Sequence, residues 1–438
     1  MKQIISILRS MKTMAMLLLI FAFSVGYATI VENDYGTMTA KSEIYNALWF
    51  EALLGFLAFN LSLNIVHYKM YTLKKAPVFI FHIGFLVILF GATVTRYVGY
   101  EGSMHIREGS SSSTIVSADA YYSVNASIND KTVNYDKVIY LSKRSKNDVS
   151  TSLELEGKKI DVELLEYIPD AIESLEADAN GHPIAKLMIT TSGKGKPVAL
   201  DMGNYFDAGN FILDFKSGLT FEKPVISMYM EDEKLYMNHE MKLEYFRMAD
   251  REKGELLANT KEIFNPRILY STDLGSFVLR EFMPLASKKI ITNPESKMNS
   301  MGVDALRFNV SVDGESAESL VFGRSKVIGQ EKHLMLNGVD VHLSYGAKNI
   351  EIPFRIKLLD FQLDRYPGSM SPASYASEVE LIDKKNGVNM PFRIYMNNIL
   401  DYQNFRFFQA SYDRDEGGTI LSVNNDPGTL PSYIGYAL

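Results

Sequence analysis

The sequence predicts a membrane protein of two parts: three spanning α-helices near the N-terminus and a large β-rich, sandwich-like domain outside the cytoplasm. The stretches that are apolar enough to span a bilayer lie before Tyr100, and period-two alternation of apolar and polar residues recurs after it. The chain of 438 residues is long enough for two or three domains. We expect spanning helices at about residues 14–31, 44–66 and 76–97, and the exported domain at 101–430.

The charge distribution differs between the two parts. Up to Tyr100 the chain holds eight Lys and Arg against four Asp and Glu, so the remainder carries a net charge of −11 within a total of −7. An acidic exported domain argues against a nucleic-acid partner. Cysteine is absent, which excludes disulfides, thiolate nucleophiles and cysteine-ligated metal centres within this chain.

The first apolar segment, residues 14–31, follows a basic start that contains Lys2, Arg9 and Lys12. This arrangement is typical of a secretory signal peptide, but the apolar run is long enough to span a membrane and two further such segments follow. We favour an uncleaved helix over a cleaved signal. Either interpretation sends residues 32–43 to the outer side.

The second segment, residues 44–66, has Tyr45 and the sole tryptophan, Trp49, near its outer end. Both residue types suit the membrane interface. Glu51 is the one charge in this segment. Its carboxylate either reaches the outer headgroups or takes part in binding or proton handling.

The connection to the third segment, residues 67–75, contains Lys69, Lys74 and Lys75. The positive-inside rule places this connection in the cytoplasm and the end of the third helix outside. In that helix, Gly84 and Gly91 are seven residues apart and share one face, which would let another helix approach closely.

His82 lies on the cytoplasmic side of the third segment, which is otherwise free of titratable groups from Ala76 to Thr95. A ring nitrogen in lipid needs a partner. It can bond a helix carbonyl, relay protons, or ligate a haem iron as axial histidines do. His67 and His105 are the candidates in this chain for a second axial ligand, although another domain could provide it.

The exported domain shows strand-like alternation at residues 159–165, 306–312 and 354–358. Residues 378–396 predict a β-hairpin because Asn386 and Gly387 supply the positive φ that such a turn needs. A short helix is expected at residues 169–178.

The polar stretch from Ser287 to Asn299 marks where the exported domain would divide into two lobes. Residues 431–438 turn apolar again and predict the start of a fourth spanning helix, as in part of a longer or fused polypeptide.

Most motifs that carry enzyme chemistry are missing. The sequence has no phosphate-binding glycine loop, no His-Glu-x-x-His, no Gly-x-Ser-x-Gly and no histidines paired at metal-ligand spacing. We interpret the four scattered histidines of the exported domain as ordinary core or surface residues: His182, His239, His333 and His342.

Three stretches of the chain resemble the ResB family, also called CcsB, of System II cytochrome c biogenesis. They are WFEALLGFLAFNL (Trp49 to Leu61), FHIGFLVILFGATVTRYVGYEGSMHIREG (Phe81 to Gly109) and DYQNFRFFQASYDRDEGGTILSVNNDPGTLPSYIGY (Asp401 to Tyr436). The resemblance implies a multi-pass protein of the inner membrane with a periplasmic domain. It also implies transport of haem b and, with a CcsA partner or fused half, its attachment to the CXXCH motifs of apocytochrome c.

In fused members of that family an intramembrane histidine is an axial ligand of a membrane-embedded haem, and His82 matches its position in the motif. The resemblance places the tryptophan-rich haem-handling segment in the CcsA half, and here Trp49 is the sole tryptophan. We therefore assign no catalytic residue to this chain. The competing interpretation is a membrane-anchored periplasmic binding or scaffold protein that binds no haem.

Overall fold

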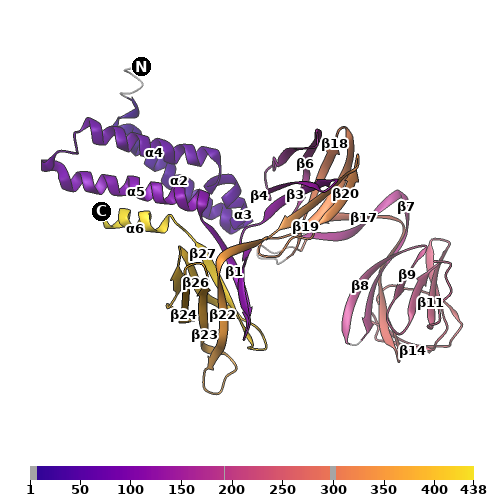
Figure 1. The fold of residues 1–438 in the computed structure, drawn as a ribbon. Coiled ribbons are helices and arrows are strands. Elements are labelled where there is room, and N and C mark those ends of the chain that lie inside the picture. The colour runs from indigo at the N-terminus through magenta and orange to yellow at the C-terminus, as the bar shows by residue number, and fades with distance from the viewer. Residues whose placement is uncertain (1–6, 192, 296–301) are drawn as a thin grey trace. The chain divides into compact units, whose positions relative to one another are not determined.

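The computed structural model describes residues 7–191, 193–295 and 302–438, and Figure 1 shows their elements. They form two compact units, one of Met1–Ala171 with Thr292–Leu438 and one of Ile172–Ile291. One of the two boundaries falls inside the polar stretch Ser287 to Asn299. Residues 296–299 of that stretch, like Lys2, lie outside the described residues.

Within the described residues of the first unit, three helices are long and apolar enough to cross a membrane. They are α2 (Met11–Tyr35), α4 (Leu48–His67) and α5 (Ala76–Val98). The predicted spanning segments are therefore confirmed, with shifted ends. α2 begins after Ser10, whose hydroxyl accepts from the Lys12 amide, and ends at Gly36, whose φ of 87° only glycine adopts readily.

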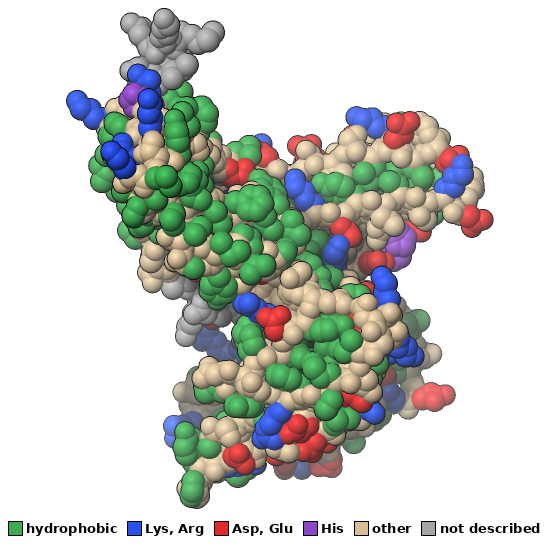
Figure 2. Space-filling model, turned by 60° about the vertical axis from the view of Figure 1, so that its left-hand side comes forward, with side chains coloured by type: hydrophobic (Ala, Val, Ile, Leu, Met, Phe, Trp, Pro, Cys, Tyr) green, Lys and Arg blue, Asp and Glu red, His purple; other side chains and the backbone are tan. Residues whose placement is uncertain are grey.

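The second helix starts later than expected. A short helix, α3 (Thr37–Ala40), and one π-helical turn at Lys41–Tyr45 precede it, and Ala47 is extended. Hydrophobic side chains cover the helices in Figure 2, and Lys and Arg gather at one end of them. The span that contains α5 has only 11% of its most apolar window buried, so most of this helix is free to face lipid or another protein.

The strands that continue the helices form a sheet of eight, which curls around its own core of Met104, Phe354, Phe407 and Leu421. One of its inner pairs, β1 and β27, is antiparallel and joins Tyr100 to Asn425. In sheet order the strands are β24 (Val388–Tyr395), β23 (Pro372–Asp383), β22 (Asn349–Arg365), β2 (Ser111–Ser117), β1 (Tyr100–Arg107), β27 (Gly418–Asn425), β26 (Phe405–Tyr412) and β25 (Leu400–Tyr402).

Two four-stranded sheets of the same unit pack face to face as a sandwich. Tyr122 stacks on Phe308 across their shared core, with ring centroids 4.8 Å apart. One sheet is β19 (Glu315–Gly323), β18 (Asp304–Val312), β6 (Lys158–Ile168) and β5 (Ser150–Leu155); the other is β20 (Lys332–Leu336), β21 (Val339–Gly346), β3 (Tyr121–Ile128) and β4 (Lys131–Val138).

The second unit is also a two-sheet structure with one shared apolar core, centred on Phe211, Phe264 and Phe277. Its five-stranded sheet is β15 (Lys261–Ile263), β12 (Lys234–His239), β11 (Val225–Glu231), β10 (Ile212–Phe215) and β9 (Asn204–Asp207). Its six-stranded sheet is β14 (Lys253–Leu256), β13 (Leu243–Arg247), β16 (Ile268–Thr272), β17 (Gly275–Thr292), β7 (Ala171–Thr191) and β8 (Lys194–Asp201).

The β-rich, sandwich-like prediction is confirmed, and the three alternating stretches lie in β6, β18 and β22. The hairpin is confirmed as β23 and β24, where Gly387 has a φ of 66°. The helix expected at residues 169–178 is wrong, because this segment enters β7. Pairing with β17 overrides the local helix propensity of its Ala and Glu residues.

The C-terminal segment is helical, as expected. The short helix α6 (Thr429–Ala437) directly follows β27. Since β1 directly follows α5, the paired strands bring α6 beside α5.

Candidate functional site

His82 projects from α5 with one ring nitrogen already engaged. Its Nδ1 lies 2.6 Å from the carbonyl oxygen of Val78, one turn earlier in the same helix. A carbonyl can only accept, so this contact requires Nδ1–H and leaves the lone pair of Nε2 available. The ring also meets Phe81 edge to face, with centroids 5.6 Å apart.

The face of α5 that carries His82 continues into a hollow between α4 and α5. The hollow has a volume of about 430 Å³, and its wall includes Ala58 from α4 and Leu86 from α5. Leu86 follows His82 by four residues, so the two share one helix face. Apolar side chains line most of the hollow, but one end of it is charged.

Glu51 and Arg96 form an ion pair at the charged end of this hollow. The Tyr97 hydroxyl donates to Glu51 over 2.9 Å, and Arg96 donates to the carbonyl of Tyr45 over 2.6 Å. Glu51 therefore has a partner inside the protein, whereas the sequence suggested a carboxylate that reaches the headgroups or handles protons. Its location one helix away from Arg96 could not be read from the sequence.

The other two candidate haem ligands lie elsewhere. His67 is exposed at the end of α4, beside the Tyr68 ring. His105 is in β1, where its Nε2 lies 2.8 Å from Asp413. Because the helix alone separates His82 from Val98 by roughly 24 Å, His105 and His82 are too far apart to bind one iron from opposite sides.

α6 packs against α5 through glycines. A Cβ on Gly84 would lie 2.8 Å from the Gly435 oxygen, and a Cβ on Gly91 would lie 2.3 Å from the Ser432 Oγ and 2.9 Å from the Gly428 oxygen. The predicted close approach at Gly84 and Gly91 is thus confirmed, and two further glycines meet them, Gly435 within α6 and Gly428 directly before it. His82 is on the side of α5 away from this contact, since two residues turn a helix through about 200°.

A hydrogen bond locks the start of α6 to the end of α5. The Thr95 hydroxyl donates to Asp426 Oδ1 over 2.6 Å, and Asp426 also accepts from the Gly428 amide and the Thr429 hydroxyl. The four elements α5, β1, β27 and α6 therefore form one continuous clasp, which holds His82 at one end.

A second hollow, of about 880 Å³, lies between the strands and the ends of the helices that are nearest to β1. Lys41 and Tyr140 both contact Asp119 there, at 3.2 and 3.1 Å. Nearby, burial raises the pKa of Glu43, but hydrogen bonds from Ser142, Arg144 and Ser145 outweigh it and hold the pKa below its usual value.

Comparison with known proteins places these features in a family. The model of the ResB-like family matches residues 72–136 and 320–432, which contain α5, the β1–β27 pair and the start of α6. Protein NrfI of Wolinella succinogenes is 31% identical over 433 residues, which are 99% of this chain and 34% of that protein. The chain belongs to the ResB-like family. It spans about a third of the length of this relative.

Both ranges matched by the ResB-like family lie in the first unit of the structure. His82, His105 and the clasp up to the start of α6 lie inside the matched ranges, whereas the second unit, Ile172–Ile291, lies wholly between them. The matched part of this ResB-like chain thus includes α5, β1 and β27, three of the four elements of the clasp.

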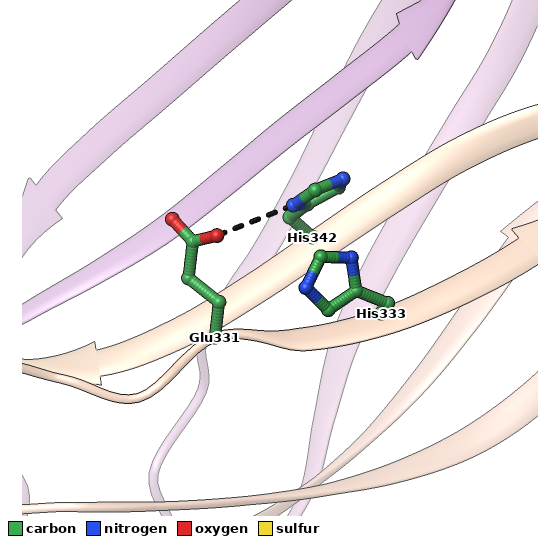
Figure 3. A group of neighbouring side chains, drawn as sticks. All are labelled: Glu331, His333 and His342. Carbon is green, nitrogen blue, oxygen red and sulfur yellow. Dashed lines mark hydrogen bonds and ion pairs between the residues drawn. The ribbon is translucent and has the colours of Figure 1, made fainter.

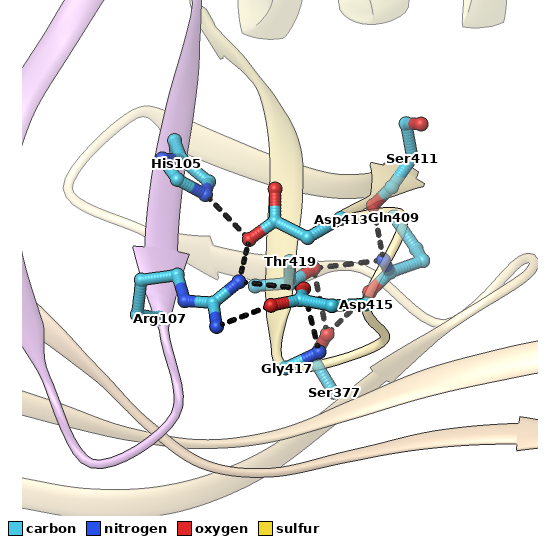
Figure 4. A network of polar contacts seen from close by, with 9 residues as sticks. All are labelled: His105, Arg107, Ser377, Gln409, Ser411, Asp413, Asp415, Gly417 and Thr419. Carbon is cyan, nitrogen blue, oxygen red and sulfur yellow. Dashed lines mark hydrogen bonds and ion pairs between the residues drawn. The ribbon is translucent and has the colours of Figure 1, made fainter. Parts of the chain in front are cut away.

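Figure 4 shows a polar network at the far end of the β1–β27 pair. Arg107 pairs with both oxygens of Asp415, at 2.7 and 2.8 Å, and with Asp413 at 2.7 Å. Arg107 lowers the pKa of Asp415 to about 2, and His105 with Arg107 lowers that of Asp413. His105 is thus part of a structural network in this ResB-like chain.

The network predicts an acid-dependent contribution to stability. A carboxyl with a depressed pKa stabilises the fold fully above its unfolded value of about 3.9, and this contribution is lost as pH falls to about 2 for Asp415. Arg107→Met should therefore lower the thermal midpoint at pH 5, and the difference from the wild type should shrink towards pH 2. Melting in detergent across this range is the measurement.

The matched control is Arg406→Met, because Arg406 pairs with a single carboxylate, that of Asp401 at 3.1 Å. Arg406→Met should lower the thermal midpoint at pH 5 by less than Arg107→Met does. A difference for Arg107→Met that stays constant from pH 5 to pH 2 would mean that the arginine acts by packing rather than by charge.

Sequence reasoning treated His333 and His342 as unrelated surface or core residues, and the structure brings them together. They lie directly opposite each other on β20 and β21, with ring centroids 3.9 Å apart. Glu331 completes the group drawn in Figure 3. The potential ligand atoms of the three residues all lie within 4.8 Å of one another. The sequence analysis predicted no hairpin at this point, and the observed β20–β21 hairpin is what places these two residues, nine apart in the sequence, opposite each other.

Proposed function

We propose that this chain takes part in transmembrane haem delivery for cytochrome c maturation, together with a CcsA-type membrane protein, separate or fused. The observation that supports this most strongly is the position of His82 in an apolar stretch of α5, where its Nδ1 bonds the carbonyl of Val78. Family membership supports the assignment. Haem b is the cargo and apocytochrome c the acceptor, while covalent attachment would fall to the partner.

The donor chemistry at His82 fits haem iron. An axial histidine ligates through one neutral nitrogen while a second group fixes the other, and the Val78 carbonyl holds Nδ1–H in this way. Phe81 and Phe85 flank the site, and both are about half exposed, which suits an apolar macrocycle held from one side. Haem bound there would supply a redox-active iron centre.

The hollow between α4 and α5 supports movement towards the outer side. It follows the His82 face of α5 towards Arg96, a distance of roughly 21 Å from His82. An apolar wall suits the porphyrin, and the guanidinium of Arg96 could exchange its Glu51 partner for a propionate. The hollow thus supports transfer of haem away from His82.

The orientation rests on the basic connection between α4 and α5, which holds Lys69, Lys74 and Lys75. The chain has no cysteine, so single cysteines can report sidedness. Thr72→Cys should react with an impermeant maleimide only after cells are lysed, and Ser110→Cys should react in intact cells with an opened outer membrane. The reverse pattern would overturn the orientation and, with it, haem entry at His82.

The function is tested by deleting the gene and measuring covalent haem in c-type cytochromes by haem staining. We expect the stained bands to disappear while a periplasmic protein without haem is still exported. Restoration by the plasmid-borne gene is the control. Normal cytochrome c levels in the deletion strain would contradict the proposal and favour an anchored scaffold that binds no haem.

A further inference from the structure

The histidine pair of β20 and β21 has the chemistry of a metal site. His333 and His342 face each other across the two strands, and Glu331 comes from the segment that leads into β20. Glu331 Oε2 lies 3.3 Å from Nδ1 of His342. Two imidazoles and one carboxylate are a ligand set that zinc and its neighbours bind, whereas Ca²⁺ and Mg²⁺ prefer oxygen alone.

A carboxylate outside the group orients one of the rings. Asp340 Oδ2 lies 3.0 Å from Nε2 of His342, on the ring edge opposite Glu331. When Nε2–H donates to Asp340, Nδ1 keeps its lone pair and directs it towards Glu331 and His333. Metal-binding histidines are commonly held by such a carboxylate partner, and this arrangement distinguishes the group from a chance surface cluster.

The geometry suits a bare ion and not haem. Ring centroids 3.9 Å apart leave no space for a porphyrin between the two imidazoles. A small ion needs only ligand atoms that converge from one side, and these atoms lie within 4.8 Å of one another. Modest side-chain rotation brings three such atoms to the bond length of about 2.0–2.2 Å that zinc requires.

We propose that Glu331, His333 and His342 bind one divalent transition-metal ion of the zinc class, with Asp340 as the group that positions His342. The three protein ligands leave a fourth tetrahedral position open to water or to a side chain of another protein. The site lies in the sandwich of the first unit and is independent of His82.

The test uses the full-length chain in detergent, purified with a tag that contains no histidine. Isothermal titration with Zn²⁺ should show one saturable site, and Co²⁺ should give the visible absorption of a tetrahedral centre. His333→Ala and His342→Ala should each weaken Zn²⁺ binding by about tenfold or more, and Asp340→Asn by roughly 10- to 100-fold.

His182→Ala is the matched control, because His182 is exposed and pairs with one carboxylate, Asp201 at 3.0 Å. It should leave the Zn²⁺ affinity unchanged. Circular dichroism and gel filtration verify that each variant is folded. The proposal is overturned if the wild type shows no saturable Zn²⁺ binding, or if the folded double variant of His333 and His342 binds as tightly as the wild type.

Discussion

Replacing His82 by alanine should lower both the haem content of the purified protein and the yield of c-type cytochromes. The change removes the available Nε2 and leaves the rest of α5 intact, since His82 bonds only its own helix at Val78 among the described contacts. Loss of an axial ligand should reduce haem occupancy by roughly tenfold or more. Absorption at the Soret maximum relative to protein, together with haem staining of the cells, measures the two effects.

His67→Ala is the control for this experiment, because His67 is an exposed histidine at the end of α4. It should change neither readout. If His82→Ala keeps its haem but the cells lose cytochrome c, His82 serves a later step such as proton or electron control. If neither readout changes, the assignment of His82 as a haem ligand is wrong.

Replacing Gly91 by alanine should destabilise the protein, although the same change usually stabilises a helix interior. The new Cβ would lie 2.3 Å from Ser432 Oγ and 2.8 Å from the Ser432 amide, so α6 must move away from α5. Overpacking of this kind costs about 1–3 kcal/mol. The thermal midpoint in detergent should fall, and proteases should cleave more readily near Asp426, where the hydrogen bond to Thr95 would be lost.

Gly55→Ala is the matched control, since Gly55 lies within α4 and a Cβ there meets nothing within 4 Å. Its midpoint should be unchanged or slightly higher. If Gly91→Ala behaves like Gly55→Ala, the glycine contact between α5 and α6 does not hold the clasp together.

The helices and many strands could be predicted because their signals are local. The apolar runs that became α2, α4 and α5 depend only on length and composition. The β23–β24 hairpin depends on the turn at Asn386 and Gly387. The segment at residues 169–178 shows the limit of this approach, because β17, about a hundred residues away, decides that it is a strand.

The residues of the candidate sites divide in the same way, into those with a local sequence signal and those that depend on long-range pairing. His82 could be singled out as a candidate because an apolar run surrounds it, and its role stays a prediction. Gly84 and Gly91 were identifiable because their spacing defines a helix face. The Glu51–Arg96 pair and the His333–His342 pair depend on which helices and strands are neighbours. Such pairing is tertiary information that neither residue carries alone.

The addition of imidazole to His82→Ala protein tests the central claim most directly. The variant has lost a side chain of about the size of imidazole, so a free imidazole can enter and bind iron in its place. The measurement is the absorption spectrum of protein purified with its membrane partner, before and after imidazole is added. Our account predicts a weak Soret band before imidazole is added. After the addition, the band should regain much of its wild-type intensity and position. A wild-type spectrum in the variant without imidazole would contradict it.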